Sequence, residues 1–192
     1  IILAKKAALS SGKFLINNKD QINKRLNYDS KDIKLKADID SENLIKSVIT
    51  SESKYPILAE ESGKSCEDLG EIYWVIDPLD GSANYSRDIP ICCVSIGLVK
   101  EMKPLLGVIY DFNNNQMYSG DVYSNSAYVN DMPINVSQKS HKKESILITG
   151  LPFKTDYSYS SLNNMIEDMQ QWQKIRMIGS AAMAACYIAS GK

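Results

Sequence analysis

The sequence has few side chains of the kind that bind zinc. Its 192 residues include one histidine, His141, and four cysteines, Cys66, Cys92, Cys93 and Cys186, with no C-x-x-C spacing. Zinc sites need several such ligands at short spacings, so none is expected. Cys92 and Cys93 fall on an expected strand, where neighbouring side chains point to opposite faces. Buried, reduced thiols of this kind indicate a cytoplasmic protein.

The sequence also lacks an excess of charge, because 22 lysines and arginines stand against 23 aspartates and glutamates. With a formal charge of −1, the chain has no field that would attract nucleic acid or an anionic membrane. We therefore expect neither as a partner, and any anion must be bound locally by backbone amides and metal.

Long hydrophobic runs are missing as well, so no membrane-spanning segment is expected. The apolar start Ile1–Ala4 is interrupted by Lys5 and Lys6, which predicts an amphipathic helix to about Leu15 rather than a signal peptide. The first residue is not methionine, and we expect the protein to begin upstream of it.

The chain does contain an apolar strand, 72–76, that ends in a cluster of polar residues. Asp77 and Asp80 follow it within a turn that Pro78 fixes, so that both carboxylates can converge on one point. Converging carboxylates repel unless a proton or cation lies between them, and oxygen ligands suit Mg²⁺. If a helix begins at Gly81 and Ser82, their amides could hold a phosphate. The alternative is that Asp-Pro-x-Asp-Gly is an ordinary turn.

The longer stretch Trp74–Tyr85 resembles the signature of the inositol monophosphatase family, W-[VI]-[IV]-D-P-[LI]-D-G-[ST]-x-N-[FY]. Members are Mg²⁺-dependent, lithium-sensitive phosphatases of small phosphorylated polyols and sugars, related to fructose-1,6-bisphosphatase and the bisphosphate nucleotidases. The resemblance implies two or three Mg²⁺ ions, held by Asp77, Asp80 and the main-chain carbonyl of Leu79. It also implies that Gly81 and Ser82 bind substrate and that Ser82 orients the attacking water.

A second acidic pair follows the short strand 55–59. Side chains alternate along a strand, so Glu60 and Glu61 are not expected to face one site together. The family motif [GA]-E-E-[ST] assigns the second glutamate to the metal, so the resemblance selects Glu61 and leaves Glu60 with a structural role.

Upstream, Asp38 is expected to open a helix, with Ser41 as a competing cap. The buried stripe of this helix would comprise Leu44, Ile45, Val48 and Ile49. The family pattern D-x-V-T-x-x-D matches the spacing of Asp32 and Asp38, and Asp38 lies 23 residues before Glu61. By resemblance, Asp38 helps to activate the water. Leu35 stands where the pattern has threonine, and the polar stretch 17–36 is expected to be a surface loop.

The rest of the chain divides into two textures. Strands are expected at 91–99, 104–110, 116–119 and 127–130, forming an antiparallel meander. From residue 145 the order is strand, helix, strand, helix, with an apolar stripe of Met165, Ile166 and Met169, after a polar loop that holds His141. We therefore expect an N-terminal α+β domain at 1–140 and part of an α/β domain at 141–192. The resemblance implies the layered αβαβα sandwich of this family.

Gly179-Ser180-Ala181-Ala182 resembles the family segment G-[ST]-A-A, which implies that Ser180 and Ala181 contact substrate. Close helix packing explains the small residues equally well. The family continues with a further acidic residue and a W-D-x-x-[AG] segment that completes the second metal site. Neither is present here, so the chain is expected to be truncated at its C-terminus.

The resemblance implies a Mg²⁺-dependent phosphomonoesterase in which metal-activated water attacks directly, and a homodimer. A bisphosphate nucleotidase is less well matched, because that branch has D-G-T-K-E-[FY] where this chain has Ala83-Asn84-Tyr85. Fructose-1,6-bisphosphatase activity and a catalytically silent binding or regulatory role are further alternatives.

Overall fold

The computed structural model describes residues 1–27, 33–151 and 156–192. The helices are α1 (Ile2–Asn17), α2 (Lys19–Ile22), α3 (Lys36–Glu52), α4 (Ser82–Tyr85), α5 (Tyr159–Met169), α6 (Ala181–Ala189) and the 3-10 turn η1 (Lys142–Glu144). The strands are β1 (Ile57–Ala59), β2 (Gly63–Lys64), β3 (Ile72–Asp80), β4 (Cys93–Lys100), β5 (Lys103–Asp111), β6 (Gln116–Asp121), β7 (Ser126–Val129), β8 (Met132–Ile134), β9 (Ile146–Thr149) and β10 (Lys174–Met177).

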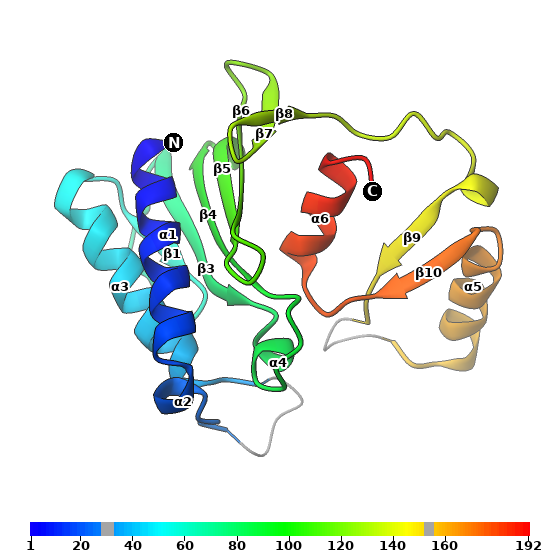
Figure 1. The fold of residues 1–192 in the computed structure, drawn as a ribbon, viewed down its shortest axis with the longest axis horizontal. Helices are drawn as coiled ribbons and strands as arrows, with labels where there is room; N and C mark the ends of the chain where they lie inside the picture. Colours follow the sequence, from blue (N-terminus) through cyan, green and yellow to red (C-terminus); the bar gives the residue numbers. More distant parts are fainter. Residues whose placement is uncertain (28–32, 152–155) are drawn as a thin grey trace.

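The main sheet has eight strands in the order β2-β1-β3-β4-β5-β6-β7-β8. Among the described strands of this sheet, the β1–β3 pair is the only parallel one. The helices α1 and α3 cover one face, and α6 contacts β4 and β5 on the other (Figure 1). Beyond α6 lie the parallel strands β9 and β10, and then α5. The layers therefore alternate as helix, sheet, helix, sheet, helix, which confirms the expected α+β sandwich.

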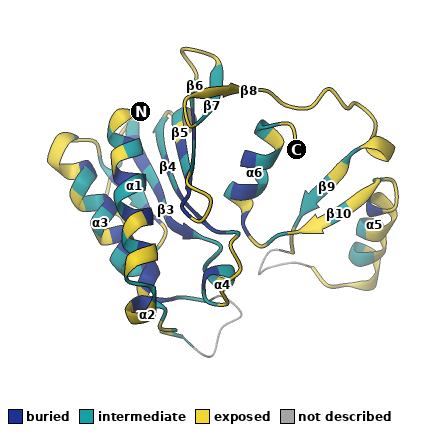
Figure 2. Ribbon diagram, viewed as in Figure 1, coloured by how far each residue is buried: buried dark blue, intermediate teal, exposed yellow. Residues whose placement is uncertain are grey.

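The core lies between the main sheet and the pair α1 and α3, where the inward sides of both helices are buried (Figure 2). In α1 the buried residues are Ala4, Ala7, Ala8, Ser11, Gly12 and Leu15, which form one helical face. A Cβ on Gly12 would lie 2.5 Å from the ring of Tyr110 on β5. Small residues therefore let α1 approach the sheet closely, and the predicted N-terminal helix is confirmed.

The loop predicted at 17–36 is only partly correct. The chain forms α2 there, and Arg25 pairs with Leu35 in an isolated antiparallel bridge. The cause is burial, because Ile22 and Leu35 are 4% and 1% exposed and anchor the segment to the core. Asp32 of the family pattern lies outside the described residues.

The predicted stripe of α5 is also partly wrong. Met169 is buried, but Ile166 is 47% exposed. Leu162, Met165 and Met169, at spacings of three and four, form the more buried side instead.

The expected meander and the strand–helix–strand–helix order after residue 145 are both present. Between β8 and η1 the chain crosses from the main sheet to the second sheet, and we propose the domain boundary there. All four cysteines are free, with Cys92 and Cys93 buried. Among the described residues, no helix is both long and apolar enough to cross a membrane.

Candidate active site

A cavity of about 420 Å³ opens where β1 and β3 end and α4 begins. It is lined by Asn27, Ile33, Lys34, Glu60, Glu61, Asp77, Leu79, Asp80, Gly81, Ser82, Ala83 and Gly179. Four of these residues are acids, and they come from two separate strand ends. The three acids named from the sequence, Glu61, Asp77 and Asp80, therefore line one cavity.

The two aspartates face the cavity because β3 is irregular at its end. The strand runs to Asp80, so the prediction of a turn after Ile76 is wrong. Asp77 pairs with Ser95 and Asp80 with Cys93, so an advance of three residues on β3 matches two on β4. In a regular strand, residues three apart point to opposite faces, and one extra residue reverses this. The bulge therefore brings both carboxylates to the same side.

Asp80 already has strong partners at the start of α6. Its Oδ2 accepts hydrogen bonds from Ser180 Oγ and the backbone N–H of Ala182, both at 2.6 Å. Ser180 is 4% exposed, and its Oγ also accepts from the N–H of Met183 as the helix cap. The hydroxyl of this predicted substrate contact is thus directed to Asp80. Ser180 and Ala181 line a neighbouring cavity of about 420 Å³.

Ser82 connects the cavity to a buried acid. Its Oγ lies 2.6 Å from Asp38 Oδ1 and 2.9 Å from the carbonyl oxygen of Leu79, the oxygen predicted to bind metal. Asp38 is 1% exposed, and burial raises its pKa to about 6. At neutral pH this carboxylate is mostly ionised, and its pKa is close to the value that suits a general base.

Asp38 does not open α3 as the sequence predicted. The helix begins at Lys36, and Asp38 Oδ2 accepts the N–H of the capping residue Leu35 at 2.6 Å. Ser41, the competing cap, is buried instead and donates to the carbonyl oxygen of Pro78 at 2.9 Å. One side of α3 thereby fixes both Ser82 and the bulged end of β3.

Glu60 and Glu61 both line the cavity, so the prediction that only one would face it is wrong. The alternation argument fails because β1 ends at Ala59, before either residue. The backbone N–H of Glu61 donates to Oε2 of the buried Glu42 at 2.8 Å, which fixes the turn. The side chain of Glu61 forms an ion pair with Lys34.

Asp77 is buried close to two other acids of the cavity. Burial, followed by repulsion from Glu60 and Asp80, raises the pKa of Asp77 to about 8. Burial and the neighbouring negative charges thus both disfavour the ionised form of Asp77.

Among the described residues, no three acidic, histidine or cysteine side chains already converge as a metal site. Asp80 is turned to α6 and Glu61 to Lys34, which accounts for this. The donor chemistry nevertheless fits a hard divalent cation, because the described residues that line the cavity include several carboxylates and no histidine or cysteine. Glu61, Asp77, Asp80 and the carbonyl of Leu79 could hold such an ion once Glu61 and Asp80 exchange their partners.

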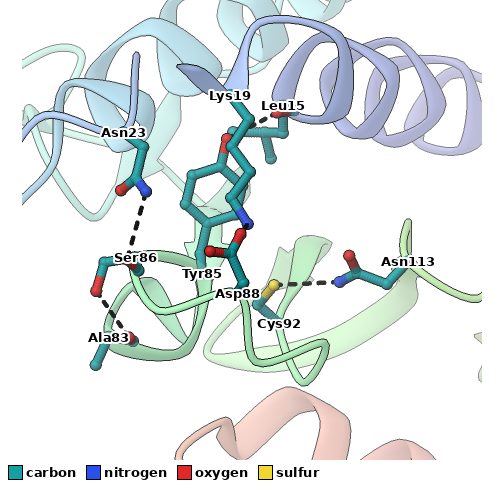
Figure 3. Close-up of polar contacts among 9 residues, drawn as sticks. All are labelled: Leu15, Lys19, Asn23, Ala83, Tyr85, Ser86, Asp88, Cys92 and Asn113. Atoms are coloured by element: carbon teal, nitrogen blue, oxygen red, sulfur yellow. Dashed lines mark hydrogen bonds and ion pairs between the residues drawn. The ribbon is translucent and has the colours of Figure 1, made fainter. Parts of the chain in front are cut away.

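The short helix α4, which begins at Ser82, and the residues that follow it are held by contacts with α1 and α2 (Figure 3). Tyr85 is 2% exposed, and its hydroxyl donates to the carbonyl of Leu15 at 2.7 Å. Lys19 lies over the Tyr85 ring, 4.7 Å from its centroid, and pairs with Asp88 at 2.5 Å. These contacts restrict how far Ser82 can move relative to Asp38.

Asn84 ties α4 to the second sheet. Its Nδ2 donates to the carbonyl oxygens of Ile91 and Ile178, both at 2.7 Å. Gly179 follows with φ +73°, and a Cβ there would lie 3.1 Å from Asn84 Nδ2. The start of α6 is therefore held against the cavity from two points, Asn84 and Asp80.

Three residues at this site are not predicted by the sequence. Lys34 falls in the polar stretch 17–36, for which the composition predicts a surface loop, and the resemblance leaves Glu60 with a structural role. Glu42 went unnoticed, although it lies one helical turn after Asp38 on the same face of α3 and is 2% exposed. That spacing was the available signal.

The chain is similar to known proteins of one family over nearly its whole length. The profile of the inositol monophosphatase family matches residues 2–192. Nus factor SuhB of Pasteurella multocida is 34% identical over 155 residues, covering 79% of this chain and 57% of that protein. A fructose-1,6-bisphosphatase/inositol-1-monophosphatase of Aquifex aeolicus is 34% identical over 195 residues, covering 98% of this chain and 72% of that protein. The structure of inositol monophosphatase from Anabaena (Nostoc) is 33% identical with a TM-score of 0.81, covering 100% of this chain and 71% of that one. The chain spans a little over half the length of the first of these relatives.

Proposed function

The chain belongs to the inositol monophosphatase family, and from this premise we propose that it is part of a Mg²⁺-dependent phosphomonoesterase acting on a small phosphorylated polyol or sugar. The observation that carries the proposal is the position of the Ser82–Asp38 pair at the wall of an acidic cavity. A buried base beside clustered carboxylates is what direct attack by water on a phosphate ester requires.

In this proposal Glu61, Asp77, Asp80 and the Leu79 carbonyl hold the metal. Bound Mg²⁺, as two or three ions, would lower the pKa of the attacking water and stabilise charge on the phosphoryl oxygens. Ser82 orients the water through its hydroxyl. Asp38 receives the proton by way of Ser82, since its Oδ1 lies 2.6 Å from the hydroxyl oxygen.

Gly81 and Ser82 line the cavity and are proposed to contact the phosphate. Ser180 and Ala181 line the adjacent cavity and are proposed to contact the alcohol part of the substrate. Gly179 lines both cavities, so the two parts of one substrate could lie on either side of it. A cytoplasmic homodimer is proposed by family resemblance.

A substrate panel tests the reaction class. We expect the intact protein to release phosphate from inositol 1-phosphate faster than from 3′-phosphoadenosine 5′-phosphate, because Ala83-Asn84-Tyr85 matches the monophosphatase pattern. Fructose 1,6-bisphosphate completes the panel. A preference for the nucleotide would contradict the assignment.

A second candidate is a binding or regulatory role without turnover. The observation in its favour is that several similar proteins are named Nus factor SuhB. Absence of phosphate release from every substrate in the panel, by a folded protein that binds Mg²⁺, would favour this role.

A further inference from the structure

The candidate metal cavity already contains a positive charge supplied by the chain. Lys34 is the one lysine or arginine among the described residues that line the cavity. Its Nζ pairs with Oε2 of Glu61, and the side chains are 39% and 13% exposed, respectively. The ammonium group is therefore the ion-pair partner of a carboxylate that the proposed function assigns to the metal.

The backbone holds Lys34 at this place. Its N–H donates to Asn27 Oδ1 at 3.0 Å, and its carbonyl accepts the N–H of Leu26 at 2.9 Å. The next residue, Leu35, is 1% exposed and caps α3. With the backbone fixed on both sides, the side chain remains within reach of Glu61.

We propose that Lys34 is a tethered competitor of the divalent cation, an inference that rests on the proposed function. An oxygen of Glu61 that is paired with the ammonium group must exchange that partner before it coordinates an ion. The positive charge of Lys34 also repels an incoming cation within the same cavity. Both effects weaken the affinity for Mg²⁺ and raise the Mg²⁺ concentration at which the site fills.

This competitor is a feature of the present sequence. In the family pattern D-x-V-T-x-x-D, the position of Lys34 is valine, which has no charge to offer Glu61. Lys34→Val therefore restores the family residue, and Lys34→Met removes the charge while keeping a long side chain.

The test is calorimetric titration of the intact, substrate-free protein with Mg²⁺ alone. We expect both Lys34 variants to bind Mg²⁺ about three- to tenfold more tightly than the wild type, as removal of a partly exposed ion pair and its repulsion permits. Lys36→Met is the matched control. Lys36 is two residues away from Lys34 and pairs with Asp40 outside the cavity. Its replacement changes the net charge of the protein by the same amount as replacement of Lys34.

Equal or weaker Mg²⁺ binding by the Lys34 variants would overturn the inference, as would an equal gain in Lys36→Met. Absence of Mg²⁺ binding by every protein would overturn the metal site and this inference together. Tighter binding by the Lys34 variants, without phosphate release from any substrate in the panel, supports the role of Lys34 and contradicts the phosphatase.

Discussion

Ser82 lines the cavity and also forms a hydrogen bond with the buried Asp38. Asp38 is 1% exposed and contacts Ser82 Oγ and the N–H of Leu35. Of the two described partners of this buried carboxylate, the Ser82 hydroxyl is the one that lines the cavity, so the proposed proton transfer to Asp38 passes through it. The proposed proton transfer therefore depends on the Ser82 hydroxyl.

Replacing Ser82 with alanine should lower kcat about 100-fold, because removal of a positioned proton-transfer group typically costs 10² or more. The KM for substrate and the affinity for Mg²⁺ should change little. Steady-state kinetics of the intact protein measure this. Ser86→Ala is the control, since Ser86 directly follows α4 and its hydroxyl bonds only to Ala83 O among the described contacts. An unchanged kcat in Ser82→Ala would contradict the proton route.

At the level of single residues, the signature stretch indicated which of its own residues line the cavity. It did not indicate which residues from other parts of the chain line the cavity with them. Asp77, Asp80, Gly81 and Ser82 are close together because they are close in sequence. Lys34 and Glu60 could not be assigned in the same way. Which way each side chain points depends on where β1 ends and where the segment before α3 is anchored, and these are tertiary features.

At the level of elements, the junction between β3 and α4 is the part that sets the site. The bulge brings Asp77 and Asp80 to one side, and Gly81 then turns the chain into α4 with φ +92°. A Cβ on Gly81 would lie 2.8 Å from the carbonyl oxygen of Ile91. Both the backbone conformation and the available space therefore require glycine.

Gly81→Ala should lower the free energy of unfolding by about 1–3 kcal/mol, because a strained φ and a backbone clash coincide. Urea denaturation measures the loss. Gly107→Ala is the control, since Gly107 lies in β5 of the same sheet with nothing within 4 Å of an added Cβ. Equal stability of the two variants would show that the junction tolerates a side chain.

Periodicity predicted most elements because hydrophobic faces repeat where helices and strands bury them. It failed where a tertiary contact replaced the local rule. The end of β3 stays paired with β4 although it contains proline and two aspartates, and α3 begins before Asp38 because Leu35 is buried. On α5, Ile166 has the right residue type for the core but lies to one side of the buried face.

At the level of the whole molecule, hydrogen bonds beside the cavity connect the main sheet to the chain between β10 and α6. Asp80 and Asn84, on the main sheet side, bond to Ser180, Ala182 and Ile178 around the start of α6. Filling the metal site would change the partners of Asp80 and so act on this link. For this reason the metal site is better tested by replacing Asp77, because replacing Asp80 would also remove the bonds to Ser180 and Ala182.

The measurement that tests the central claim most directly is phosphate release from inositol 1-phosphate by the intact protein, titrated with Mg²⁺, for wild type and Asp77→Asn. We predict no release without Mg²⁺, saturable release with it, suppression by lithium, and at least about 100-fold lower release by Asp77→Asn. The variant should remain folded, because asparagine has nearly the same size and its Oδ1 can still accept the bond that the N–H of Leu79 donates to Asp77 Oδ1 at 3.1 Å. Release that is independent of Mg²⁺, or equal in the folded variant, would contradict the account.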